Sequence, residues 1–436
     1  MQLIMTIFFI LLFGTATGHA IAMDAEASNM ATQSDSARPF SSDLEEPTFD
    51  LTLNRALSMA LSRHPELTML SHEEQAREAA TRQAGLPPNP ILSASLEDIA
   101  GSGAFQGIDQ MQTTLQWSQS IELGGKRFAR TRKASLTQDL TKWDILAKRN
   151  EITAEVTSAF VALLGAQQQH AYLTEATHLA EQVTRIVAER VRAGKGSPIE
   201  ETKATLLLAA SQIDLKRSDL DLQAARETLA TTWGSSVASF HSAKGEMETL
   251  SQVAPLSQLI PHLDRNPDMA RLEAELNQRR AAVDLEKAQA IPDLTLSFGI
   301  RQFSERGDTA FLVGMSLPLP IVNRNEGAVE EARIRETIAE VARRATRLRL
   351  VTTLTEAHRA LVTAYTEASL IKTTLLPRAQ ETFDAVSEGY RLGKFDLLDV
   401  LDAQRTLVSV RMQYLRALTE YHKSAADVER LVGKQL

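Results

Sequence analysis

The fold is decided at Ser118-Gln-Ser-Ile-Glu-Leu-Gly-Gly-Lys-Arg127, where an alternating apolar and polar segment gives way to a very long helical segment. The same junction recurs at Ser316-Leu-Pro-Leu-Pro-Ile-Val-Asn-Arg-Asn325. Three further pairs keep the same order along the chain: Arg63-His-Pro-Glu-Leu67 with Arg265-Asn-Pro-Asp-Met269, Leu86-Pro87 with Ile291-Pro292, and Arg192-Ala-Gly-Lys195 with Arg391-Leu-Gly-Lys394. Four matches in one order indicate an internal duplication.

The duplication predicts two repeats, residues 51–240 and 256–436, joined by a linker at 241–255. Each repeat is expected to hold a first helix, two short strands, a very long helix, a Gly-Lys turn and a last helix. The expected helices are about 54–84, 126–192 and 199–231 in the first repeat, and 267–290, 325–392 and 396–432 in the second. At about 1.5 Å per residue the long helix is a rod of about 100 Å, too long for a globular core.

Proline and the heptad pattern predict how these rods pack. No proline interrupts 126–192, whereas Pro377 predicts a kink in the second rod. Apolar and small residues recur in steps of four and three over 152–173, 204–229 and 403–431. This spacing predicts coiled-coil packing, with helices 54–84 and 199–231 stacked end to end beside the first rod. The remaining helix faces are expected to be solvated.

Four segments between the helices alternate with a period of two, which is typical of strands with one apolar face. They are 91–97, 111–118, 294–300 and 311–317. Each is close to the about 9–11 residues with which a tilted strand crosses a bilayer. Four strands are too few to close a barrel, so we expect three copies to share twelve strands. The predicted fold class is mostly α with a membrane β-barrel; the alternative is a soluble sheet with one face on a core.

The N-terminal residues are predicted to lie outside the repeats. An apolar run from Leu3 to Phe13, followed by Ala20-Ile-Ala22, predicts a signal peptide over 1–22. Residues 23–50 are rich in Ser, Ala, Asp and Glu, which predicts a flexible tether. No later stretch reaches the about 18 apolar residues that a transmembrane helix needs.

The composition narrows the function. The 436 residues include no cysteine, which excludes disulfides, thiolate metal sites and a lipidated N-terminal cysteine. A formal charge of −8 argues against nucleic acid as a partner. The glycines of 101–107 and 124–126 depart from the nucleotide-binding motifs, and the nine histidines are scattered. We therefore expect no enzyme, no cofactor and no metal site.

Five stretches resemble the TolC-type outer-membrane efflux channels, also called outer membrane factors. They are Leu51-Thr-Leu-Asn-Arg-Ala-Leu57, Gln83-Ala-Gly-Leu-Pro-Pro-Asn-Pro-Ile-Leu92, Glu122-Leu-Gly-Gly-Lys-Arg127, Ser316-Leu-Pro-Leu-Pro-Ile-Val-Asn-Arg-Asn325 and Gly389-Tyr-Arg-Leu-Gly-Lys-Phe-Asp-Leu-Leu-Asp-Val-Leu-Asp-Ala-Gln404. The middle three resemble the CzcC-like heavy-metal branch. Ser120 stands where many relatives have proline, which we expect to leave the first strand-to-helix corner less rigid.

The resemblance implies a homotrimer in the outer membrane of a Gram-negative cell. Each chain would give four barrel strands and long coiled-coil helices that form a periplasmic tunnel. The implied partners are outer-membrane lipid, a periplasmic adaptor (membrane fusion protein) and an inner-membrane RND pump. The branch implies heavy-metal cations as cargo, either cobalt, zinc and cadmium or copper and silver. The alternatives are a channel for drugs or organic toxicants and a periplasmic coiled-coil adaptor.

The resemblance also implies two groups of site residues. Two turns resemble the tunnel tips that contact the adaptor: Arg192, Gly194 and Lys195, and Arg391, Gly393 and Lys394. Asp399 and Asp402 fall where the family has an acidic ring at a periplasmic gate, and such rings attract cations. For Asp399 the alternative is that it joins Asp396 in capping the N-terminus of the last helix.

Overall fold

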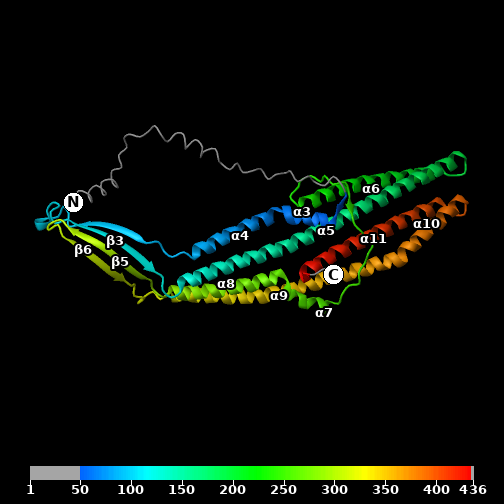
Figure 1. The fold of residues 1–436 in the computed structure, drawn as a ribbon. Helices are drawn as coiled ribbons and strands as arrows, with labels where there is room; N and C mark the ends of the chain where they lie inside the picture. Colours follow the sequence, from blue (N-terminus) through cyan, green and yellow to red (C-terminus); the bar gives the residue numbers. More distant parts are fainter. Residues whose placement is uncertain (1–49, 434–436) are drawn as a thin grey trace, which may run out of the picture. The chain divides into compact units, whose positions relative to one another are not determined.

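Long helices alternate with short strands over residues 50–433, the part of the chain that the computed structural model describes (Figure 1). The predicted signal peptide, 1–22, lies outside the described residues, as does the predicted tether, 23–50, except for its last residue. The described part forms one compact unit.

The first repeat has one more helix than predicted. It contains α3 (Leu53–Arg63), α4 (Pro65–Ala84), β2 (Ile91–Glu97), a short 3₁₀ turn η1 (Gly103–Phe105), β3 (Gln112–Ile121), α5 (Lys126–Arg192) and α6 (Pro198–Thr231). The single helix predicted over 54–84 is wrong because Pro65 holds His64 in an extended conformation, with φ −60° and ψ 124°. Helix α4 then starts anew, and His64 Nδ1 accepts the Glu66 N–H at 3.2 Å.

The second repeat follows the predicted order. It contains α7 (Leu256–Leu259), η2 (Ile260–Arg265), α8 (Pro267–Gln289), β5 (Leu294–Phe303), β6 (Thr309–Ser316), α9 (Glu326–Leu370), η3 (Ile371–Leu375), α10 (Leu376–Arg391) and α11 (Leu397–Val432). The irregularity predicted at Pro377 takes the form of the π-helical turn η3, directly before α10. Proline lacks the N–H that would continue the α-helical bonding, so the backbone pattern changes there.

The strands form one antiparallel sheet in the order β2-β3-β5-β6. Its centre joins the two repeats, because β3 pairs with β5 with Trp117 opposite Phe298. Strand β3 extends through Ser120, which lies opposite Thr295, and so ends later than predicted. The two hairpins predicted from the alternation are confirmed by the β2–β3 and β5–β6 pairings.

Helix α5 is the centre of the helical part. Near the sheet the helices pack in the order α4-α5-α8-α9, and toward the other end in the order α6-α5-α11-α10. Helices α3 and α6 meet end to end beside α5, where Met59 and Leu229 share a buried cluster with Val156, as predicted. A short parallel pair, β1 (Leu51–Thr52) with β4 (Ala243–Lys244), ties the predicted linker to the start of the first repeat.

The predicted heptads are the buried faces of these helices. On α11, all but one of the predicted residues are buried: Ala403, Leu407, Tyr414, Ala417, Tyr421, Ser424, Val428 and Leu431. On α6, Ser218 is 1% exposed and lies 3.3 Å from His170 of α5. Small residues at these positions allow the close helix packing that the sequence predicts.

Candidate functional site

The two tip turns have the same backbone. In each, the lysine N–H, of Lys195 or Lys394, donates to the carbonyl five residues earlier at 2.8 Å. The preceding glycine N–H donates to the carbonyl three residues earlier at 3.0 Å. Gly194 and Gly393 have φ values of 72° and 74°, in the left-handed region that favours glycine. The duplicated sequence therefore forms a duplicated turn.

The structure brings the two tips together. The Arg190 guanidinium of α5 lies 4.7 Å from the ring centroid of Tyr390 on α10, and its Nη1 lies 3.4 Å from the Tyr390 carbonyl oxygen. Beside this pair lies a buried apolar cluster from α5, α6, α10 and α11: Val183, Val187, Ala204, Leu397, Val400 and Leu401. The predicted tip residues Arg192, Lys195, Arg391 and Lys394 are exposed at the ends of these helices. The exposed basic side chains of both turns thus lie at one end of the helices, where Arg391 also pairs with Glu388 at 3.6 Å.

The Tyr390 hydroxyl is an unusual feature of this end. Tyr390 is 5% exposed, and its hydroxyl has no hydrogen-bond partner among the described residues. Burial raises the pKa of Tyr390, because the apolar surroundings disfavour the phenolate, while the Arg190 charge opposes the rise. No local pattern in the sequence pairs Arg190 with Tyr390, since the two residues belong to different repeats.

The predicted gate residues share one groove. Asp399 and Asp402 line a groove of about 410 Å³ between α10 and α11, with Phe395 and Arg378 also on its wall. Asp402 is exposed and has no ion-pair partner among the described residues. The Asp399 carboxylate accepts the Asp396 N–H at 3.0 Å, one half of a capping box at the start of α11. Asp399 therefore takes part in capping the N-terminus of α11, which is the alternative role predicted for this residue.

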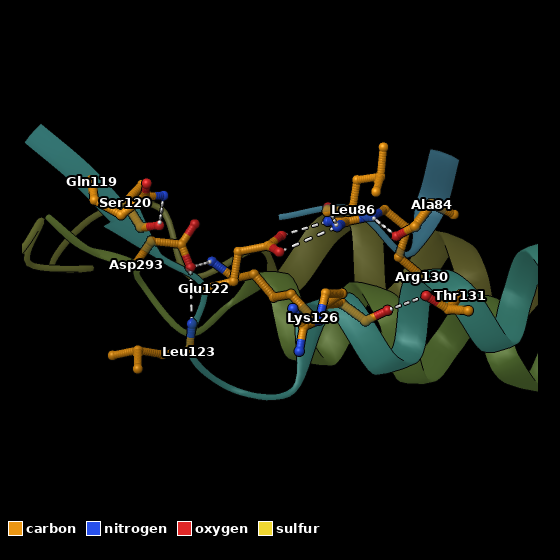
Figure 2. Close-up of polar contacts among 11 residues, drawn as sticks. Ala84, Leu86, Gln119, Ser120, Glu122, Leu123, Lys126, Arg130, Thr131 and Asp293 are labelled. Carbon is orange, nitrogen blue, oxygen red and sulfur yellow. Dashed lines mark hydrogen bonds and ion pairs between the residues drawn. The ribbon is translucent and has the colours of Figure 1, made fainter. Parts of the chain in front are cut away.

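The corner between β3 and α5 holds a network that the sequence did not predict (Figure 2). Asp293, just before β5, accepts the Lys126 ammonium at 2.6 Å and the Leu123 N–H at 3.2 Å. Arg130 donates to Glu122 through Nη1 at 2.5 Å and Nη2 at 3.2 Å. These contacts fix the chain where it passes from strand to helix.

The same corner is also tied to the first helix of its own repeat. Arg130 donates to the carbonyl oxygens of Ala84 at 2.8 Å and Leu86 at 3.0 Å, as Figure 2 shows. The expectation that Ser120 leaves this corner less rigid stays a prediction, and these bonds and ion pairs are contacts that hold the corner without proline. The Glu122-Leu-Gly-Gly-Lys-Arg127 motif and the Ile291-Pro292 match mark the two segments that meet here, but nothing in the sequence paired Lys126 with Asp293.

The two faces of the sheet differ sharply. One face is apolar and exposed, most strongly on β6, where Phe311 is 84%, Val313 79% and Met315 74% exposed. On the opposite face Arg301 donates to Thr114 Oγ1 at 2.9 Å and lies 3.5 Å from Glu97. Apolar surface of this extent needs an apolar surrounding, and monomeric soluble proteins rarely expose it.

The described residues contain neither a membrane-spanning helix nor a cluster of metal ligands. Over 50–433, no helix is long and apolar enough to cross a membrane. Within the same range, no three His, Asp or Glu side chains gather as metal ligands. The acidic pair on α11 is thus a feature of charge rather than a chelating cluster within one chain.

The chain matches the family model described as "Outer membrane efflux protein" over residues 56–235 and 261–434. It is 34% identical to the cobalt-zinc-cadmium resistance protein CzcC of Cupriavidus metallidurans, over 88% of this chain and 90% of CzcC. It is 25% identical to the pyoverdine export outer membrane protein OpmQ of Pseudomonas aeruginosa, over 87% of this chain and 85% of OpmQ.

Among solved structures, the fold is similar to that of CusC, with a TM-score of 0.73 and 19% identity over 90% of this chain and 96% of CusC. The family match places the protein in the outer membrane and rules out both an enzyme and a periplasmic adaptor. The chain belongs to the outer membrane efflux protein family, with the TolC-like fold that its duplicated sequence predicts.

Proposed function

We propose that three copies of this chain form a passive exit duct of a tripartite efflux pump. The observation that carries the proposal is the four-stranded sheet. Its apolar face is exposed, and the outer edges of strands β2 and β6 pair with no other strand within 50–433. Lipid suits the apolar face, but unpaired backbone groups at an open edge are costly in lipid. Three copies supply twelve strands, an even number within the range of closed barrels.

The trimer is tested in membranes. Outer-membrane fractions of cells that express the full chain should contain a trimer that survives mild heating in dodecyl sulfate. Chemical cross-linking before solubilisation provides an independent measure of the number of copies. Protein that fractionates as a monomer contradicts the proposal.

We propose heavy-metal cations as the cargo, which the 34% identity to CzcC supports. Organic compounds are the second candidate, supported by the 25% identity to OpmQ. A deletion strain, with and without a plasmid copy, would be grown in zinc, cadmium, cobalt, copper and silver, and beside detergents and dyes. Plasmid-dependent tolerance to metals alone supports the proposal, and tolerance to organic compounds alone contradicts it.

We propose that the two tip turns contact a periplasmic adaptor. The adaptor links the duct to an inner-membrane RND pump. Reversing two exposed charges, Lys195→Glu with Lys394→Glu, should abolish plasmid-dependent tolerance while the trimer persists. The matched control is Lys216→Glu, which reverses an exposed lysine on α6 away from the tips. Tolerance that survives the double reversal contradicts the assignment of the tips.

We propose that Asp399 and Asp402 form an acidic gate, six carboxylates in three copies. Asp399→Asn with Asp402→Asn removes the charge and leaves an oxygen to accept the Asp396 N–H. Block by divalent cations should weaken, because the ring no longer concentrates these cations. Single-channel conductance in planar bilayers should rise as a consequence of the weaker block. Asp427→Asn, an exposed site near the other end of α11, is the control. Unchanged conductance in the double variant contradicts the gate.

A further inference from the structure

The polar face of the sheet carries charge at one end. Strands β2, β3, β5 and β6 join the long helices at one end and are linked by the loops 98–111 and 304–308 at the other, which we call the hairpin end. The polar face would line the proposed duct, because the opposite apolar face suits lipid. Over the described strands, Glu97 and Arg301 are the only charged residues of this face, and both lie near the hairpin end.

The Arg301 side chain of β5 reaches across two strands. Its Nε donates to Thr114 Oγ1 of β3 at 2.9 Å, and its Nη1 donates to Gln112 Oε1 of the same strand at 3.3 Å. Its Nη2 lies 3.5 Å from the Glu97 carboxylate of β2. Thr114 lies directly opposite Arg301 in the sheet, whereas Gln112 lies opposite Phe303. The guanidinium is therefore directed towards the hairpin end.

A second carboxylate joins this network through an amide. Gln112 Nε2 donates to Asp98 Oδ2 at 2.7 Å, while the Gln112 oxygen accepts from Arg301. Asp98 directly follows β2. One guanidinium thus serves two carboxylates, that of Glu97 directly and that of Asp98 through Gln112.

The hairpin loops add more negative than positive charge. Asp109, Glu305 and Asp308 are exposed there. The one cation of these loops, all of whose residues the structure describes, is Arg306, which lies 3.9 Å from Glu305. Without Arg301, the hairpin end would therefore present a group of carboxylates to the inside of the duct.

The acidic pair near the tips has no such counter-charge. Asp402 has no ion-pair partner among the described residues, whereas Glu97 faces Arg301. In three copies, Asp399 and Asp402 carry a formal charge of −6, because each copy contributes −2. At the hairpin end, Glu97 and Asp98 contribute −2 per copy and Arg301 contributes +1, so three copies carry −3. Rings of carboxylates attract cations, so the two ends of the duct differ in how strongly they would hold a cation.

We propose that Arg301 sets the charge of the outer mouth of the duct, so that divalent cations leaving the barrel are not held there. Loss of its charge would give the mouth the same formal charge, −6, as the proposed gate. Arg301 acts through the carboxylates of Glu97 and Asp98 and needs no contact with the cation. The inference rests on the proposed trimeric duct and adds a residue that governs release at its exit.

The charge of Arg301 is tested by Arg301→Gln, which keeps a side chain able to donate hydrogen bonds. Cobalt chloride would be added on the barrel side of single channels in planar bilayers. The concentration that halves the current should fall about fivefold, the order expected when three charges act on a divalent cation at about 10 Å in water with a screening length of about 10 Å.

Two further variants separate charge from structure. Arg301→Lys keeps the charge without the planar fork, so the half-blocking concentration should stay at the value of the unaltered chain. Glu97→Gln with Arg301→Gln restores the formal charge of −1 per copy, so it should reverse the fall. A purely structural role for Arg301 predicts instead that both variants behave like Arg301→Gln.

Each outcome supports or overturns the inference. A fall in Arg301→Gln that is reversed by Glu97→Gln and absent in Arg301→Lys supports it. An unchanged value in Arg301→Gln, a fall that persists in the double variant, or an equal fall in Arg301→Lys overturns it while the duct stands. An unaltered chain that forms no channel overturns both.

Glu97→Gln alone keeps the inference testable if Arg301→Gln yields no heat-resistant trimer. This variant removes one negative charge per copy and leaves Arg301 in place. The half-blocking concentration on the barrel side should then rise about fivefold, by the same charge argument with opposite sign. An unchanged or lower value overturns the inference.

Discussion

The two tip turns share one backbone and differ in where they place a large side chain. Arg190 of the first corresponds to Gly389 of the second, and Gly196 of the first to Phe395 of the second. In the second tip, a Cβ on residue 389 would stand 2.2 Å from the Phe395 ring. In the first, glycine stands in place of the phenylalanine at position 196, and the Arg190 guanidinium lies 4.7 Å from the ring centroid of Tyr390. The same turn backbone can therefore carry a large side chain at either of these two positions, with glycine at the other.

The two strand-to-helix corners differ in their surroundings. Gly124, with φ 69°, lies so close to Ile291 that a Cβ would stand 2.7 Å from the isoleucine Cδ1. Val322, at the corresponding place in the second repeat, is 95% exposed. The first corner meets the second half of its own chain, whereas the second corner lies at the outer edge. The backbones differ as well, since Gly124 has a positive φ and Val322 is not among the described residues with positive φ. The position in the chain decides which of the two corners is covered.

The largest effect is expected at the first corner. Gly124→Ala and Gly125→Ala both place a side chain at positive φ, at a shared cost of about 1–2 kcal/mol. Only Gly124→Ala also collides with Ile291 and the Ala288 carbonyl, which adds about 1–3 kcal/mol of overpacking. Thermal unfolding of the detergent-solubilised protein should therefore show a larger fall in apparent Tm for Gly124→Ala. Equal falls would mean that the corner is not packed as described.

A smaller effect is expected at the second tip. Gly389→Ala forces the Phe395 ring to move, at about 1–3 kcal/mol, partly offset by the better helix propensity of alanine. Adding Phe395→Ala should restore the resistance of the tip to limited proteolysis, because the collision is removed. If adding Phe395→Ala to Gly389→Ala increases cleavage instead, the described difference between the two tips is contradicted.

The smallest effect is a pH dependence at the contact between the tips. Because burial raises the pKa of Tyr390 above about 10, the folded protein holds the phenol proton more tightly than the unfolded chain does. This contribution to stability is fully present below pH 10 and is lost as the pH rises through the raised pKa. Tyr390→Phe should remove that part of the fall in apparent Tm between pH 9 and 11, and Tyr172→Phe, at a less buried tyrosine, should leave it unchanged.

Much of the fold could be predicted because its signals are local and repeated. Helix α5 could be predicted because no proline interrupts 126–192 and a heptad runs through its middle. Strand β2 could be predicted from its alternation of apolar and polar residues. The break at His64 could also have been predicted, since the residue before proline avoids the helical conformation. The apolar pattern on both sides of His64 instead favoured one continuous helix.

The site was less predictable because its contacts are long-range. Lys126 and Asp293 lie in different repeats, and so do Arg190 and Tyr390, and no local pattern pairs them. The sequence allowed two roles for Asp399, because an acidic residue near the start of a helix can either cap that helix or face a pore.

The π-helical turn η3 affects how the second repeat can change length. Buried residues of α9 and η3 follow the heptad as far as Ala368 and Ile371, and those of α10 resume at Ala379 and Phe383. The step from Ile371 to Ala379 is eight residues instead of seven, so the pattern resumes one residue late. One residue turns a helix by about 100°, so η3 resets the rotational phase of α10 on α11. The second repeat therefore absorbs one extra residue at η3 while its buried face continues, whereas α5 of the first repeat is a continuous helix without such a turn.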